Sequence, residues 1–230
     1  MTKNTVSENE MLVDNDTGIK NLSRRKFLGY AGATSGLLVL ASACNKNDDL
    51  GTNLGSGDIG ILNYAYALEQ LEAAFYTQVI ATPYPFANAL EGQLMNDIKL
   101  HEIAHREFFK NALGSNAIGS LEVDFSSINF SSRDSVLATA KAFEDLGVSA
   151  YNGAGKLLIS ADYLTLAGKI VSVEARHAAW IRDIISFGTF ADSSVVDANA
   201  LDKSRTPLEV LGIAGSFIKT KINASNLPTS

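Results

Sequence analysis

The chain has 230 residues, of which 46% are hydrophobic and 19% charged, a balance ordinary for a globular protein with room for one domain plus extensions. The net charge of −6, with no Lys/Arg-rich stretch after residue 45, disfavours a nucleic-acid partner. A single cysteine, Cys44, excludes an internal disulfide and a zinc site built from cysteines.

The first 44 residues carry the features of an export sequence. Residues 23–28, Ser-Arg-Arg-Lys-Phe-Leu, place an arginine pair ahead of a mildly apolar run of small residues that ends at residues 41–44, Ala-Ser-Ala-Cys. The pattern resembles a twin-arginine signal peptide with a lipoprotein cleavage box, although Ala41 stands where such boxes usually have leucine. The alternative is a short buried or membrane-spanning helix, but residues 27–43 contain three glycines and are short for a span. The resemblance implies export to the periplasm or cell envelope, with a membrane tether through a lipid on Cys44.

The remaining chain divides by composition and periodicity. Residues 45–57 are polar and rich in glycine, which predicts a flexible linker. A helical domain is expected over residues 58–188, followed by a C-terminal extension over residues 189–230.

The first half of the domain predicts two helices. Helical periodicity begins at Asp58, which can cap a first helix over residues 58–80. Pro-Tyr-Pro at residues 83–85 ends this helix, because proline cannot continue it. A second helix is predicted over residues 87–113 and stops at Gly114. The turn between them is short, so we expect an antiparallel hairpin.

The second half repeats this arrangement, with helices predicted over residues 133–159 and 162–187. The connection between the halves, residues 114–132, could reach about 60 Å when extended, enough to cross a bundle of helices about 35–40 Å long. Two antiparallel hairpins joined by a long crossover predict an all-α fold, a ferritin-like four-helix bundle. One more helix, from Pro207 to about Asn223, is expected to pack outside the bundle.

Acidic and imidazole residues recur at matched positions in the two halves. Glu69 is followed seven residues later by a tyrosine, as is Glu144, and a Glu-x-x-His pair begins 33 residues after Glu69 and 30 residues after Glu144. The candidate metal ligands are therefore Glu69, Glu102, His105, Glu144, Glu174 and His177.

These residue types at these spacings point to a dinuclear metal site. All four glutamates fall in the apolar stripes of their helices, where an unpaired charge is strongly unfavourable. Two divalent ions balance four carboxylates, and neutral imidazoles complete the coordination. Residues three apart project from one helix face, so each Glu-x-x-His pair can point into one cavity. The set is that of di-iron and di-manganese bundles, which predicts two Fe ions, with Mn as the alternative. Satisfied core or surface Glu–His pairs are the remaining interpretation.

Four neighbouring residues receive other interpretations. His101 lacks a glutamate three residues before it and is expected to flank the ligands rather than to bind metal. Glu72 lies one turn after the first candidate ligand, but its counterpart in the second half is Gly147. The match between the two halves therefore favours Glu69 as the ligand, and Glu72 is expected either beside the site or exposed to solvent. Tyr76 and Tyr151 are expected in the core, with hydroxyls able to hydrogen-bond a ligand carboxylate.

The residues that carry these features resemble a known family. Residues 61–76 resemble the first helix of ferritin-like proteins related to plant desiccation-related proteins. His-Glu-Ile-Ala-His at residues 101–105 and Val-Glu-Ala-Arg-His at residues 173–177 resemble the ligand pattern shared with bacterioferritin and rubrerythrin. The resemblance covers about residues 58–188. It implies the same six ligands, with Glu102 and Glu174 bridging the ions.

The ferritin-like fold hosts oxidases, peroxidases, catalases and storage cages, so it leaves the activity open. The leading expectation is redox chemistry with O2 or peroxide, as in a di-iron oxidase or peroxidase or a manganese catalase-like enzyme. The alternative is a non-enzymatic metal-binding or stress-protective envelope protein, in which the ions cross-link the helices. A storage cage is disfavoured because a lipid tether and a fifth helical segment hinder close packing of many subunits. A homodimer remains an open alternative.

Overall fold

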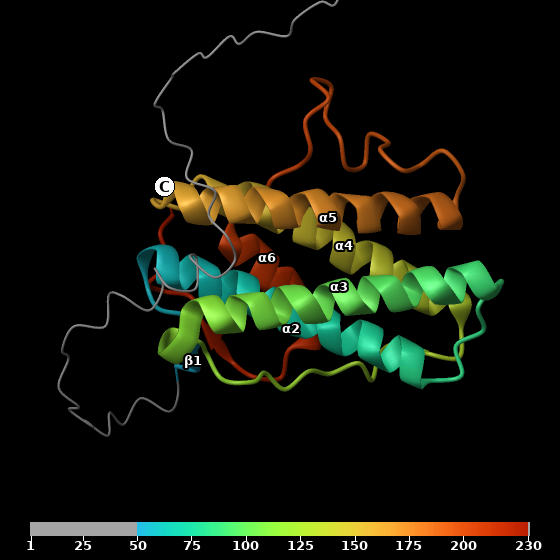
Figure 1. Cartoon of the computed structure of the whole chain (residues 1–230), viewed down its shortest axis with the longest axis horizontal. Helices are drawn as coiled ribbons and strands as arrows, with labels where there is room; N and C mark the ends of the chain where they lie inside the picture. Colours follow the sequence, from blue (N-terminus) through green and yellow to red (C-terminus); the bar gives the residue numbers. More distant parts are fainter. Residues whose placement is uncertain (1–49, 230) are drawn as a thin grey trace, which may run out of the picture. The chain divides into compact units, whose positions relative to one another are not determined.

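The computed structural model describes residues 50–229, so the expected export region and the first residues of the expected linker lie outside the described residues. The described part is mostly helical, as predicted (Figure 1). Its α-helices are α2 (Gly57–Ala81), α3 (Ala89–Leu113), α4 (Arg133–Gly155), α5 (Ala161–Ile185) and α6 (Pro207–Ala214). Two 3₁₀ turns, η1 (Gly114–Asn116) and η2 (Gly215–Phe217), and two short strands, β1 (Thr52–Asn53) and β2 (Ile222–Asn223), complete it.

The four long helices begin and end close to their predicted positions because the end signals are local. Side chains at Asn88, Ser132 and Ser160 each accept a hydrogen bond from the backbone N–H three residues later, which caps α3, α4 and α5. Gly114 ends α3 with a φ of 55°, a conformation that glycine adopts without strain.

The start of α2 differs from the prediction. Asp58 does not cap its own helix, which begins after Ser56. Its carboxylate instead accepts hydrogen bonds from the backbone N–H groups of Ile159 and Ser160, at 2.7 and 2.9 Å. Asp58 thereby joins the start of α2 to the turn before α5. That turn begins earlier than expected, because α4 ends at Gly155 rather than near residue 159.

Helices α2 and α3 pack as one hairpin and α4 and α5 as the other (Figure 1). The long crossover between the hairpins is held against α2 by two buried amide side chains. Asn63 donates to the carbonyl of Asn116 and accepts from the N–H of Ile118. Gln70 donates to the carbonyl of Gly119 and accepts from the N–H of Leu121. The connectivity is the predicted one, and the crossover backbone finds its hydrogen bonds on the bundle.

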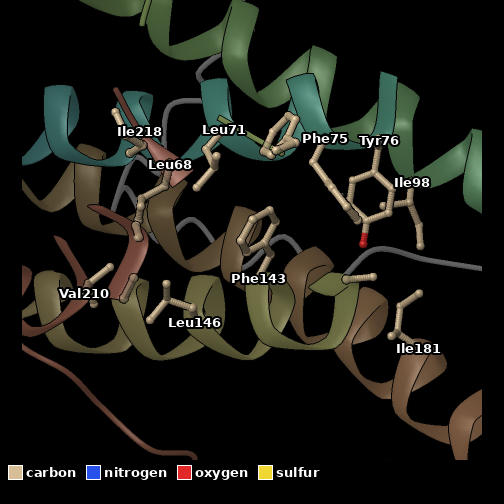
Figure 2. Packing of buried hydrophobic residues seen from close by; sticks show 14 of the residues in the cluster. Leu68, Leu71, Phe75, Tyr76, Ile98, Phe143, Leu146, Ile181, Val210 and Ile218 are labelled. Atoms are coloured by element: carbon tan, nitrogen blue, oxygen red, sulfur yellow. The ribbon is translucent and has the colours of Figure 1, made fainter. Parts of the chain in front are cut away.

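An aromatic cluster fills the core beside the centre of the bundle. Phe75 of α2 is fully buried and meets Phe143 of α4 edge to face, with ring centroids 5.1 Å apart. Figure 2 shows Phe75 and Tyr76 of α2 on the side of the core that faces Phe143. This apolar packing fixes the relative position of α2 and α4, the two helices that each carry a single candidate glutamate.

Both ends of the described chain depart from the expectations. Residues 45–57 were expected to form a linker, but β1 pairs in parallel with β2, and Leu54 is 0% exposed. The folded domain therefore begins before residue 58. The last helix, expected to reach about Asn223, ends at Ala214, and the chain then makes η2 and pairs with β1. α6 is a helix additional to the four long ones, as predicted, and the buried Val210 and Ala214 on one of its faces join the main hydrophobic cluster.

Candidate metal centre

The structure brings the six predicted residues together in the middle of the four long helices. α2 contributes Glu69, α4 contributes Glu144, and α3 and α5 each contribute a Glu-x-x-His pair. Two overlapping groups result, in each of which one ligand atom per residue lies within 4.8 Å of the others. The groups are Glu69, Glu102, His105 and Glu174, and Glu102, Glu144, Glu174 and His177. Glu102 and Glu174 belong to both, which is the position the resemblance gave to bridging carboxylates.

The two histidines approach the cluster in a reciprocal way. His105 Nδ1 of α3 lies 2.9 Å from Glu174 Oε1 of α5, and His177 Nδ1 of α5 lies 2.9 Å from Glu102 Oε1 of α3. Each imidazole thus faces the glutamate of the other Glu-x-x-His helix. The same nitrogens lie 3.5 Å from Glu69 Oε2 and 3.4 Å from Glu144 Oε2, respectively. The centre therefore consists of two similar half-sites.

Burial leaves the cluster without enough partners of its own. The four carboxylates are 0–1% exposed. Six oxygens of these carboxylates and one nitrogen of each histidine are buried and form no hydrogen bond with another described residue. They are Glu69 Oε2, both oxygens of Glu102, Glu144 Oε2, both oxygens of Glu174, His105 Nδ1 and His177 Nδ1. Such groups are costly to bury unless cations or protons compensate them.

The electrostatics of the metal-free cluster point in the same direction. Burial, followed by the charge of Glu174, raises the pKa of Glu102 to about 8. Burial is also the largest cause that raises the pKa of Glu144, to about 7. Burial lowers the pKa of His105, but the surrounding carboxylates outweigh it and raise this pKa to about 12. The raised pKa values of these carboxyl groups and of the imidazole beside them mark a site that favours positive charge.

Two tyrosines orient the outer glutamates, as expected from the repeated spacing. Tyr76 of α2 donates a hydrogen bond of 2.5 Å to Glu144 Oε1 of α4, and Tyr151 of α4 donates one to Glu69 Oε1 of α2. The later residue of α2 bonds to the earlier residue of α4, and the earlier residue of α2 to the later residue of α4. The two helices are therefore antiparallel and are joined by two equivalent hydrogen bonds. In both glutamates the second oxygen, Oε2, is left facing the cluster.

His101 flanks the cluster, as the sequence indicated, and is not a member of either ligand group. Its Nδ1 lies 2.9 Å from Nε2 of His177, with the two rings only 8° from parallel. When Nδ1 of His177 binds a metal ion, the proton of the neutral ring is on Nε2, which then donates a hydrogen bond to Nδ1 of His101. His101 is at the surface, while His177 is 5% exposed. The exposed imidazole therefore fixes the orientation of the buried one. The sequence predicted that His101 lies beside the candidate ligands of its own helix. It could not predict the contact with His177, because that residue lies on α5.

A four-helix bundle with one glutamate on each of two helices and Glu-x-x-His on each of the other two defines a class of candidate dinuclear metal proteins. Residues 57–186, more than half of the chain, match the profile of the ferritin-like domain family, and the chain belongs to this family. No curated protein matches the chain. Fold, family and buried Glu/His cluster agree on a protein able to hold metal ions.

Proposed function

We propose that the chain binds two iron ions, or two manganese ions, between its four long helices and uses them for redox chemistry with O2 or peroxide. The observation that carries this proposal is the set of eight buried polar atoms that lack hydrogen bonds. The closest partners of these atoms are one another, and two imidazoles do not balance the charge of four buried carboxylates, so the set is strongly unfavourable without further positive charge. Two divalent ions bring as many positive charges as the four carboxylates bring negative ones.

The donor set supports iron or manganese. It consists of carboxylate oxygens and imidazole nitrogens, and the sole cysteine lies outside the described residues. Glu69 and His105 would serve one ion, Glu144 and His177 the other, and Glu102 and Glu174 both. A bound pair of such ions supplies the electrons for reduction of O2 or peroxide. The chain itself holds the carboxylates in place through the two tyrosine hydroxyls and limits the access of water by burial.

The degree of burial favours one alternative function. His105, at 14% exposure, is the most exposed of the six residues, and the four glutamates are essentially covered. Ions enclosed in this way would cross-link all four helices, which is the role expected in a non-enzymatic metal-binding or stress-protective protein.

One experiment separates these functions. The metal-free protein is titrated anaerobically with ferrous iron, the bound iron is counted, and optical spectra are recorded after addition of O2 or peroxide. We expect about two ions per chain and a new absorption band on oxidation. Two ions without a spectral change would support the structural role, and fewer than about two would contradict a dinuclear centre.

A matched pair of variants checks the ligand assignment. Glu144→Ala should lower the iron stoichiometry because it removes a buried oxygen of the cluster. Glu107→Ala, on α3 but with a side chain 45% exposed and paired with Arg106, should leave the stoichiometry unchanged. Equal stoichiometry in the two variants would mean that α4 contributes no ligand.

We further propose that the protein is exported and tethered at the cell envelope through a lipid on Cys44. The twin-arginine pattern and the cysteine that ends it support this proposal. Among residues 50–229, the structure contains no helix whose length and hydropathy suit a membrane span. Mass spectrometry of the mature protein tests the proposal: a lipid-bearing N-terminus at Cys44 supports it, and an intact Met1 contradicts it.

A further inference from the structure

A fifth glutamate, outside the six predicted ligands, is buried beside the cluster. Glu72 lies on α2, one turn after Glu69, and is 4% exposed. The structure gives its carboxylate no hydrogen bond or ion pair with another residue of the range 50–229, in contrast to the buried Glu91, which pairs with Arg133. Burial is the largest cause, and the charges of the four clustered glutamates a further one, that raise the pKa of Glu72 well above its ordinary value.

The register of α2 against α4 places Glu72 between the two half-sites. The hydrogen bond from Tyr151 to Glu69 marks one level of the α2–α4 interface, and the bond from Tyr76 to Glu144 marks another. Glu72 is three residues from Glu69 and four from Tyr76, so its side chain projects from the level between these two bonds. Glu102 and Glu174, which belong to both half-sites, approach from the opposite pair of helices.

Gly147 of α4 provides the space for this carboxylate. A Cβ atom at position 147 would lie 3.2 Å from Oε1 of Glu72 and 3.8 Å from Oε2. The position corresponds to Glu72 in the other half of the repeat, so a side chain is present on one helix and absent on the facing one. The absence of a side chain at Gly147 thus leaves room on α4 for the carboxylate of Glu72.

We propose that Glu72 is a seventh ligand and the fifth carboxylate of the centre, which binds between the two half-sites from the α2–α4 side and competes there with small anions. This inference rests on the proposed metal pair. An unpartnered buried carboxylate at the centre of a cationic pair gains the charge compensation that no side chain gives it. Anions that need the same position, peroxide among them, must then displace Glu72.

Cobalt(II) and azide test this proposal on the full chain, since the visible absorption of Co²⁺ responds to its ligands without any turnover. In Glu72→Gln and Glu72→Ala we expect an altered Co²⁺ spectrum and a metal affinity reduced about 10–100-fold. Azide should bind the Co²⁺ form of Glu72→Ala more tightly than the wild type. Glu91→Gln is the matched control: it removes an equally buried carboxylate away from the cluster and should leave spectrum and azide affinity unchanged.

Gly147→Ala adds an independent test, because its methyl group would press on Glu72. It should shift the Co²⁺ spectrum in the wild-type background and have no effect in Glu72→Ala. Wild-type spectra, metal affinities and azide affinities in both Glu72 variants would overturn the proposal and leave Glu72 as a neighbour of the cluster that binds no metal. That result would leave the dinuclear centre intact, whereas wild-type protein that binds fewer than about two Co²⁺ ions would contradict the centre itself.

Discussion

The hydrogen bond between Tyr76 and Glu144 allows a quantitative test of how the cluster is held in the absence of metal. Tyr76 is fully buried, so after Tyr76→Phe no water can replace its hydroxyl beside Glu144. A hydrogen bond to a charged group contributes about 1.5–3 kcal/mol. For a domain of this size, this corresponds to a decrease of roughly 3–12 °C in Tm. The free energy of unfolding should be measured by urea denaturation in chelator at pH 8, where Glu144, with a pKa of about 7, is largely ionised.

Tyr64 of the same helix provides the control. Its hydroxyl is equally buried, but it has no hydrogen-bond partner among the described residues. Tyr64→Phe removes an unsatisfied polar atom and should be neutral or stabilising. If the two variants have the same free energy of unfolding, the Tyr76–Glu144 bond contributes nothing and the reasoning about the cluster's support is wrong.

Three further predictions concern the cluster and the core. His101→Phe should lower metal affinity about 10–100-fold, because His177 loses the acceptor of its Nε2 proton, and an unchanged affinity in a metal titration would exclude this supporting role. Metal binding should release protons and strengthen as pH rises, since His105, with a pKa raised to about 12, must lose a proton to become a ligand. Calorimetry in two buffers of different ionisation enthalpy counts these protons, and equal heats would contradict the release. Phe75→Ala should reduce the free energy of unfolding by about 3–5 kcal/mol, and a loss below about 1 kcal/mol would mean that the aromatic cluster does not stabilise the bundle.

The sequence predicted the bundle well because its determinants are local. Helical periodicity and residues such as Asn88 and Gly114, at the ends of α3, act over a few positions and need no knowledge of the tertiary fold. The Glu-x-x-His spacing works in the same way, since one helix turn brings Glu102 and His105 to one face. The six candidates therefore lie together as expected.

What the sequence did not predict depends on contacts between distant segments. Asp58 had the features of a helix cap, yet its carboxylate oxygens accept hydrogen bonds from the turn before α5, about a hundred positions later in the chain. The polar composition around Thr52 predicted a linker because no local pattern reveals a strand of two residues. Glu72 remained open for a similar reason: its burial depends on the absence of a side chain at Gly147 of another helix.

The pairing of β1 with β2 has a consequence for biosynthesis. Thr52 and Asn53, near the start of the described chain, align with Ile222 and Asn223, near its end. Chains are made from the amino terminus onward, and domains generally fold as units. The ribosome must therefore synthesise the chain as far as Asn223 before β1 can pair with β2, so the start of the domain waits for its last segment.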